Sequence, residues 1–251
     1  MIQLKSEREI ELMAEGGRIL AATLDLLRRA VRPGVSTAEL DQVAADFLAQ
    51  HPGTVAAFKG LYGFPGHVCI SINEEIVHGI PSPKRVLKDG DIISLDFGVK
   101  FHGYYTDAAI TVPVGSIGPD DQRLLEVCQR ALHAGIAAAV AGNHIGDIGA
   151  AIGAVVKQAG LTTADDLVGH GVGTGPHEDP QVPNFGKPKR GTRLIPGLTI
   201  AIEPMVNLGV SATRTLADNW TVVTRDGKRS AHFEHTIAIT DGAPRILTVA
   251  A

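Results

Sequence analysis

Cysteine is scarce in this sequence, and long apolar runs are missing. Only two of the 251 residues are cysteines, Cys69 and Cys128, which excludes a disulfide framework and suits a reducing compartment. Residues 1–10 are rich in charge and lack the apolar core of a signal peptide, and no apolar run is long enough to span a bilayer. The net charge of −4 argues against general binding to nucleic acid or to an anionic membrane. We therefore expect a cytoplasmic enzyme that binds neither DNA nor membranes.

What is present is the composition of an ordinary globular protein, with 44% hydrophobic and 20% charged residues. A chain of this length can form one large domain or two halves with a sizeable core. The start signals of four helices lie at Ser6, Ser36, Pro119 and Asp147. The first two are each followed three residues later by a glutamate, which is the pattern of a capping box. Proline suits the first position of the third helix, and Asp147 is expected to cap the fourth, which should end at Gly160.

A strand that contains a carboxylate lies in the first half of the chain. Residues 92–99 form an apolar run rich in β-branched side chains, residues 98–103 are typical of a turn, and residues 104–112 are predicted to return as a second strand. Such a hairpin can bring Asp96 and Asp107 side by side. A carboxylate within an apolar strand is costly to bury unless something neutralises it. The alternative is that the two aspartates only cap turns.

Three more ionisable residues lie in or next to strand-like runs bounded by glycine or proline. They are His170 in LVGHGVG, Glu203 in PGLTIAIEP and Glu234 in HFEHTIAI. Together with the two aspartates they make four carboxylates and one imidazole. This set of mostly hard oxygen ligands is sufficient for two divalent cations that share bridging carboxylates. A mononuclear zinc site more usually has three ligands and is often histidine-rich.

Asp96, Asp107, His170, Glu203 and Glu234, in this order and spacing, resemble the five metal ligands of the methionine aminopeptidases of peptidase family M24. The local sequences match as well: VCISINEEIVHGIP, GDIISLDFGV, YTDAAIT, GHGVG, HEDPQVPN, GLTIAIEPM, NWTVVTRDG and FEHTIAIT. The resemblance runs from about residue 3 to residue 248. It is to the short type I form, because only thirty residues separate Glu203 from Glu234, where type II enzymes have a long insertion. It implies a single catalytic domain over residues 1–251.

The fold implied by the resemblance is α+β. It is the pita-bread (creatinase/aminopeptidase-like) fold, in which two halves related by a pseudo-twofold axis surround a central antiparallel sheet. A faint internal repeat agrees with this, because Gly90 precedes Asp96 by six residues and Gly197 precedes Glu203 by six, each across an apolar strand. Chance is the alternative explanation, since a glycine six residues before an acid is a weak signal.

The implied activity is removal of the N-terminal initiator methionine from nascent proteins when the second residue is small. The attacking group would be a hydroxide held by two divalent cations, and cobalt, manganese, iron and zinc all suit the ligand set. The resemblance gives Glu203 a second role, in taking the proton from the attacking water and passing it to the leaving amine. His78 and His177 would hydrogen-bond the substrate amide and the tetrahedral intermediate. A lone histidine is more often structural, but each of these two lies in a His-x-x-Pro context beside the ligand sequences.

The other histidines considered have no role in the family pattern. His67, His102, His133 and His144 are expected to be surface or packing residues. His232 and His235 flank Glu234 and are expected to lie behind the ligands or at the surface.

The resemblance also implies an apolar pocket for the methionine side chain, with His78 at its edge. Its residues are Phe58, Leu61, Phe64, Cys69 and Trp220. An aromatic slot of this size favours an unbranched thioether, and the alternative is that these are core residues. The lining departs from the family, where tyrosines are frequent at the positions of Leu61 and Phe64 and a cysteine at that of Phe58. Pro176 stands where a phenylalanine is usual, which predicts a wider pocket mouth.

Two groups of basic residues offer a surface for a binding partner. A basic loop is formed by Lys187, Lys189, Arg190 and Arg193, with further basic residues at Arg225, Lys228 and Arg229. Related bacterial enzymes dock near the ribosomal exit through such a surface, and the alternative is a solvated loop.

We expect a monomer. An X-Pro peptidase shares the ligand set but usually has an additional N-terminal domain, and an inactive pita-bread binding module would lack ligands that are present here.

Overall fold

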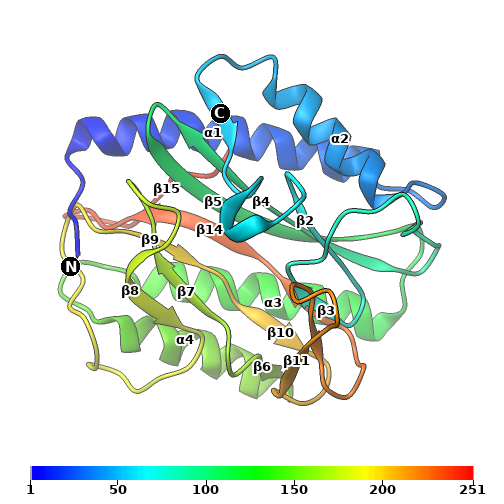
Figure 1. Cartoon of the computed structure of the whole chain (residues 1–251). Helices are drawn as coiled ribbons and strands as arrows, with labels where there is room; N and C mark the ends of the chain where they lie inside the picture. The colour runs from blue at the N-terminus through cyan, green and yellow to red at the C-terminus, as the bar shows by residue number, and fades with distance from the viewer. Residues whose placement is uncertain (1, 251) are drawn as a thin grey trace.

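The computed structural model describes residues 2–250, so residues 1 and 251 of the predicted domain lie outside the described part (Figure 1). Its helices are α1 (Glu7–Ala30), α2 (Thr37–Leu48), α3 (Pro119–Ala138) and α4 (Ile145–Gln158), and a short 3₁₀ turn covers Leu61–Gly63. Between residues 2 and 250, none of these helices has the length and apolar character needed to cross a membrane.

A large antiparallel sheet has the strand order β1-β4-β5-β14-β9-β7-β8, with β2 paired to β4 and β15 paired to β14. Its strands are β1 (Thr54–Ala56), β2 (Cys69–Ile72), β4 (Ile92–Phe101), β5 (Tyr104–Pro113), β7 (Val168–Gly171), β8 (Glu178–Pro183), β9 (Thr199–Ile202), β14 (Glu234–Ala238) and β15 (Arg245–Ile246). Two smaller antiparallel sheets have the orders β13-β10-β6 and β11-β12-β3. Their strands are β3 (Glu75–Val77), β6 (Thr162–Thr163), β10 (Met205–Asn207), β11 (Thr213–Thr215), β12 (Val222–Thr224) and β13 (Ser230–His232).

The helix start signals are largely confirmed. Ser6 and Ser36 each cap a helix through a complete capping box with the glutamate three residues on, and Pro119 is the first residue of α3. The prediction for Asp147 is wrong, because α4 begins two residues earlier, at Ile145. Asp147 occupies the third helical position, from which its carboxylate accepts the backbone N–H of His144, the N-cap residue, at 2.8 Å.

The turn of the aspartate hairpin is shorter than residues 98–103. β4 and β5 stay paired as far as Phe101 and Tyr104, so only His102 and Gly103 form the turn. Both have left-handed backbone conformations, with φ of 46° and 96°, as the two-residue hairpin turn that matches strand twist requires. The predicted turn was too long because Gly98 lies inside the ladder, opposite Asp107.

Two helix pairs pack against two halves of the large sheet (Figure 1). α1 and α2 share one hydrophobic core with β1, β2 and β4, whereas α3 and α4 share another with β8, β9 and β14. Gly90 and Gly197, which lead into β4 and β9, both have left-handed φ, at 91° and 88°. The strand ladder and the repeat together confirm an α+β fold built from two similar halves.

Candidate active site

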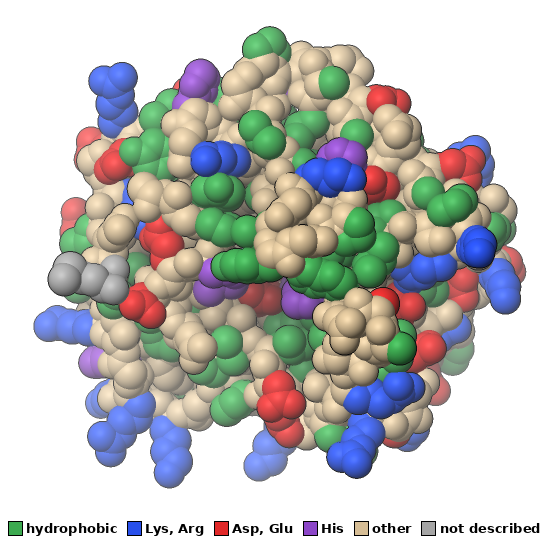
Figure 2. Space-filling model, in the orientation of Figure 1, with side chains coloured by type: hydrophobic (Ala, Val, Ile, Leu, Met, Phe, Trp, Pro, Cys, Tyr) green, Lys and Arg blue, Asp and Glu red, His purple; other side chains and the backbone are tan. Residues whose placement is uncertain are grey.

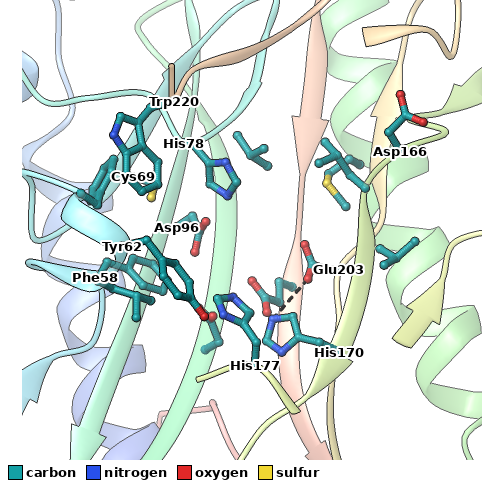
Figure 3. A pocket seen from close by; sticks show the side chains of 18 residues that line it. Phe58, Tyr62, Cys69, His78, Asp96, Asp166, His170, His177, Glu203 and Trp220 are labelled. Carbon is teal, nitrogen blue, oxygen red and sulfur yellow. Dashed lines mark ion pairs between the residues drawn. The ribbon is translucent and has the colours of Figure 1, made fainter. Parts of the chain in front are cut away.

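Five neighbouring strands of the large sheet hold the five predicted metal ligands. Asp96 lies on β4, Asp107 on β5, His170 on β7, and Glu234 opens β14, while Glu203 directly follows β9. β4, β5, β14, β9 and β7 are consecutive in the sheet, so residues far apart in the chain meet. All five residues line one cavity (Figure 3). In the space-filling view, a hollow near the middle of this face shows histidine and acidic side chains beneath a ridge of hydrophobic ones (Figure 2).

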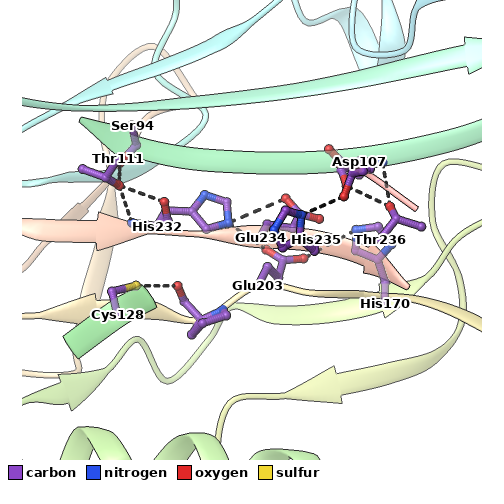
Figure 4. Close-up of polar contacts among 12 residues, drawn as sticks. Ser94, Asp107, Thr111, Cys128, His170, Glu203, His232, Glu234, His235 and Thr236 are labelled. Atoms are coloured by element: carbon purple, nitrogen blue, oxygen red, sulfur yellow. Dashed lines mark hydrogen bonds and ion pairs between the residues drawn. The ribbon is translucent and has the colours of Figure 1, made fainter. Parts of the chain in front are cut away.

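Hydrogen bonds fix two of the predicted ligands, Asp107 and His170, in this cavity. The Thr236 hydroxyl lies 2.8 Å from both the backbone nitrogen and the carbonyl oxygen of Asp107, which ties β5 to β14 beside Glu234 (Figure 4). His170 Nδ1 lies 2.9 Å from the carbonyl oxygen of Gly171 and therefore carries the ring proton. His170 Nε2 is left with a lone pair and lies 3.5 Å from Glu203 Oε1.

The carboxylates of this site share a buried, poorly solvated space. One oxygen each of Asp96, Asp107 and Glu234 has no hydrogen-bond partner among residues 2–250. Burial raises the pKa of Asp96, Glu203 and Glu234 well above the usual carboxyl range, and the nearby charge of Asp107 raises all three further. Burial also raises the pKa of Asp107 to about 7. In the absence of cations, the cluster therefore holds protons that a cation would displace.

These residues fit a site for divalent cations. Asp107, His170 and Glu234 offer ligand atoms that all lie within 4.8 Å of one another. Burial lowers the pKa of His170 to about 4, with the neighbouring His177 as a further cause, so the imidazole is neutral and able to coordinate. A cation would satisfy the unpartnered carboxylate oxygens and offset their mutual repulsion.

His78 and His177 approach the cluster from two different loops. His78 follows β3 with a left-handed φ of 61°, a strained conformation for a residue with a side chain and one that is typical of functional sites. His177 directly precedes β8, and its ring centroid lies 4.5 Å from that of His170. Burial lowers the pKa of both, and the neighbouring His177 adds to the effect on His78. Both are therefore neutral N–H donors near pH 7.

A buried ion pair orders the loop that holds His177. The side chain of Lys5 is only 2% exposed and pairs with Glu178. Glu178 Oε1 also accepts the backbone N–H of Gly175 at 2.8 Å and the hydroxyl of Thr174 at 2.9 Å. These contacts tie the loop before β8 to Glu178, the first residue of that strand.

An apolar chamber opens directly beside the cluster. The cavity has a volume of about 320 Å³, at the lower end of the range for small-molecule sites. All five predicted pocket residues line it: Phe58, Leu61, Phe64, Cys69 and Trp220. Trp220 meets the ring of Phe64 edge-on at 5.2 Å and that of His78 at 6.3 Å, so the indole joins the apolar chamber to the histidine at its edge.

The chain as a whole matches known proteins. Residues 11–241 match the model of metallopeptidase family M24. Methionine aminopeptidase 1 of Bacillus subtilis is 52% identical over 248 residues, covering 99% of this chain and 99% of the relative. The chain belongs to metallopeptidase family M24 and, within it, to the methionine aminopeptidases. A second relative, methionine aminopeptidase 1 of Mycobacterium tuberculosis, is 42% identical over 99% of this chain and 96% of its own length.

Solved structures show the same fold. The methionine aminopeptidase of Thermotoga maritima superimposes with a TM-score of 0.97 at 40% identity, covering 99% of this chain and all of that chain. An Xaa-Pro dipeptidase from Bacillus anthracis gives a TM-score of 0.80 at 22% identity, and this chain covers 62% of its length. The first comparison confirms the pita-bread fold, and the second is a likeness of fold alone.

Several residues that line the cavity were not predicted from the sequence. They are Tyr62, Val77, Asp166, Leu167, Val168 and Met205. Tyr62 is 77% exposed, has a left-handed φ of 48°, and stacks on His177 with ring centroids 6.1 Å apart and planes within 19°. The sequence feature that could have identified Tyr62 as a pocket residue is its position in GLYGF, between the predicted pocket residues Leu61 and Phe64. Pro176 is not among the described residues that line the cavity, whereas Tyr62 lines it and stacks on His177.

The histidines outside the ligand set differ in their surroundings. His67 pairs with Asp41, and His235 Nδ1 lies 2.8 Å from the hydroxyl of Thr248. His232 is 1% exposed and lies beside the carboxylates, so it belongs behind the ligands and not at the surface. Of the basic residues, Arg229 is engaged with Asp121 and with the carbonyl oxygen of Gly90, whereas Lys187, Lys189, Arg190 and Arg193 are exposed.

Proposed function

We propose that this enzyme removes the N-terminal methionine from polypeptides when the second residue is small, using two divalent cations bound by Asp96, Asp107, His170, Glu203 and Glu234. The observation that carries the proposal is the continuity of one cavity, which is lined both by apolar and aromatic side chains and by the carboxylate–imidazole cluster. A side chain in the chamber would place the first peptide bond of a substrate at the cluster. Bound cations would polarise the scissile carbonyl and acidify the attacking water.

The residues of the chain supply the rest of the reaction. Glu203 lines the cavity at the cluster, where its carboxylate can accept a proton from the attacking water and then give it to the leaving amine. His78 and His177, neutral and at the cavity wall, are placed to donate hydrogen bonds to the substrate amide and to the developing oxyanion. The Trp220–Phe64 pair holds the methionine side chain.

Selection of a small second residue is assigned to the mouth of the cavity. The Tyr62 ring and the His177 ring are stacked there, and a branched residue following methionine would have to pass them. The loop that carries Tyr62 is held by backbone hydrogen bonds from Gly60 to Phe64 and from Phe64 to Leu61, both 2.9 Å. A rigid wall of this kind discriminates by size.

We further propose that the enzyme acts on nascent chains in the cytoplasm as a monomer. Contact of the Lys187–Arg193 loop with the ribosome stays a prediction, supported only by its exposure and charge. The test of the proposed function is cleavage of Met-Ala-X, Met-Pro-X, Ala-Pro-X and Leu-Ala-X peptides by metal-stripped protein supplied with cobalt, manganese, iron or zinc. We expect rapid release of methionine from the first peptide and little cleavage of Ala-Pro-X or Leu-Ala-X. Preferential cleavage of Ala-Pro-X would show an X-Pro peptidase instead.

A further inference from the structure

His232 lies beside the carboxylate cluster and has no part in the reaction described above. Its Nε2 is 3.7 Å from Glu203 Oε2 and 3.8 Å from Glu234 Oε2 (Figure 4). The side chain is 1% exposed, and neither ring nitrogen has a hydrogen-bond partner among residues 2–250. A buried polar group without a partner is unfavourable, so its placement calls for an explanation.

The backbone, and not the ring, holds this residue in place. The backbone N–H of His232 donates to the Thr111 hydroxyl at 2.8 Å, and that hydroxyl also lies 2.8 Å from the His232 carbonyl oxygen. Ser94 contacts the same hydroxyl at 2.8 Å. His232 is also paired with Met205 in the β10–β13 ladder. The backbone of His232 is thus fixed at a position from which the ring Nε2 lies near two carboxylates.

Glu203 therefore lies between two imidazoles that differ in their hydrogen bonding. His170 Nε2 is 3.5 Å from one oxygen of Glu203, and His232 Nε2 is 3.7 Å from the other. The Nδ1–H of His170 donates a hydrogen bond to a carbonyl oxygen, so its Nε2 is a lone-pair ligand. No such acceptor holds His232 Nδ1 among the described residues, and an Nε2–H is the form that interacts favourably with a carboxylate oxygen.

We propose that His232 is a positioning residue whose Nε2–H, 3.7 Å from Glu203 and 3.8 Å from Glu234, attracts both carboxylates electrostatically and keeps Glu203 in the orientation needed to bind cations. One Glu203 oxygen then faces the His170 side of the site while the other is restrained by His232. Residues that support metal ligands from behind typically change metal affinity or activity by about 10–100-fold when removed. The inference rests on the proposed role of Glu203, but its effect on cation binding does not depend on the substrate.

The experiment compares His232→Leu, which keeps a similar volume without a donor, with His232→Gln, whose amide can still donate. The readouts are the Kd of Mn²⁺ for metal-stripped protein, measured by calorimetry, and the kcat and KM for Met-Ala-X. We expect His232→Leu to weaken Mn²⁺ binding and to lower kcat by about 10–100-fold each, with little change in KM. His232→Gln should stay within a few-fold of the unmodified protein.

A matched control is His235→Leu. This imidazole also adjoins Glu234 in sequence but is bonded to Thr248, so its loss should leave Mn²⁺ affinity and kcat unchanged. If His232→Leu does not fold, His232→Asn replaces it, because its shorter amide cannot reach the carboxylates. The proposal is overturned if the donor-free or short variants bind Mn²⁺ normally, or if His232→Gln is as impaired as they are. A protein that cleaves no Met-Ala-X but loses Mn²⁺ affinity in His232→Leu would refute the proposed function and leave this inference standing.

Discussion

Asp96 and Asp107 lie diagonally across the β4–β5 ladder, since Asp96 is opposite Ala109 and Asp107 is opposite Gly98. Diagonal partners of this kind point to the same face of a sheet. The two-residue turn at His102 and Gly103 sets this register, and a slip by one residue would turn one carboxylate away from the other.

Asp107→Ala is expected to abolish turnover. Asp107 lies in the group whose ligand atoms come within 4.8 Å of one another, and its loss leaves the remaining acids to repel each other. Methionine release from Met-Ala-X should fall by more than the roughly 100-fold seen when only a partner of a ligand is lost, with reduced metal content by elemental analysis. Asp46→Ala, at an exposed position on α2, is the control. Substantial hydrolysis by Asp107→Ala with one cation bound would refute the two-cation scheme.

The metal-free protein should lose stability as the pH rises through neutrality. Asp107 has a folded-state pKa of about 7, far above that of an unfolded chain, so its contribution to the free energy of unfolding disappears as the pH rises through 7. His170 and His232, with pKa values of about 4 and about 3, are neutral in both states above roughly pH 6.5 and do not offset this loss.

Thermal unfolding of stripped and Mn²⁺-loaded protein between pH 6.5 and 8.5 measures the effect. Asp107, with its folded-state pKa of about 7, stops contributing once the pH exceeds that value, so it changes the free energy of unfolding by less than about 1 kcal/mol over this range. Tm of the stripped protein should therefore fall by a few degrees, and that of the loaded protein by less. Parallel curves for the two forms would show that cations do not replace these protons.

The loss of His177 should slow the reaction more than it weakens substrate binding. Its proposed hydrogen bond strengthens as the oxyanion develops, so His177→Ala should lower kcat by about 10²–10³-fold with a smaller effect on KM. His133→Ala, at an exposed position on α3, serves as control. An unchanged kcat would place His177 outside the reaction.

Selectivity for the second residue should change at the mouth of the cavity. Tyr62→Ala removes the ring stacked on His177, and the ratio of kcat/KM for Met-Ala-X to Met-Val-X should fall a few-fold, given about 1 kcal/mol per methylene-sized contact. Pro176→Phe adds a ring directly before His177 in the sequence, at a position whose present side chain does not line the cavity, and should raise that ratio by a similar factor. Ratios that stay constant in both variants would exclude this wall as the determinant.

The sequence predicted what depends on local pattern. The capping boxes at Ser6 and Ser36 were visible because their partners are three residues away. Asp147 was misplaced because two long-range backbone bonds, from Ile145 to Thr192 and from Gly146 to Arg190, fix the start of α4. A motif three residues long carries no trace of such contacts.

The same limit explains the residues of the site that were missed. Tyr62 stacks on His177 from a loop in which it has a left-handed backbone conformation, and its place in GLYGF indicates nearness to the pocket but not this conformation. His232 reaches Glu203 through the pairing of β10 with β13. The five ligands, in contrast, could be named through a family resemblance, because their order and surrounding residues match a known pattern.

Titration of metal-stripped protein with Mn²⁺, while methionine release from Met-Ala-X is followed, tests the central claim most directly. We expect no release of methionine without cations and a rate that reaches its plateau after two cations are bound. A plateau at one cation would contradict the dinuclear scheme but not the aminopeptidase. Release by fully stripped protein at the loaded rate would contradict a metal-dependent aminopeptidase altogether.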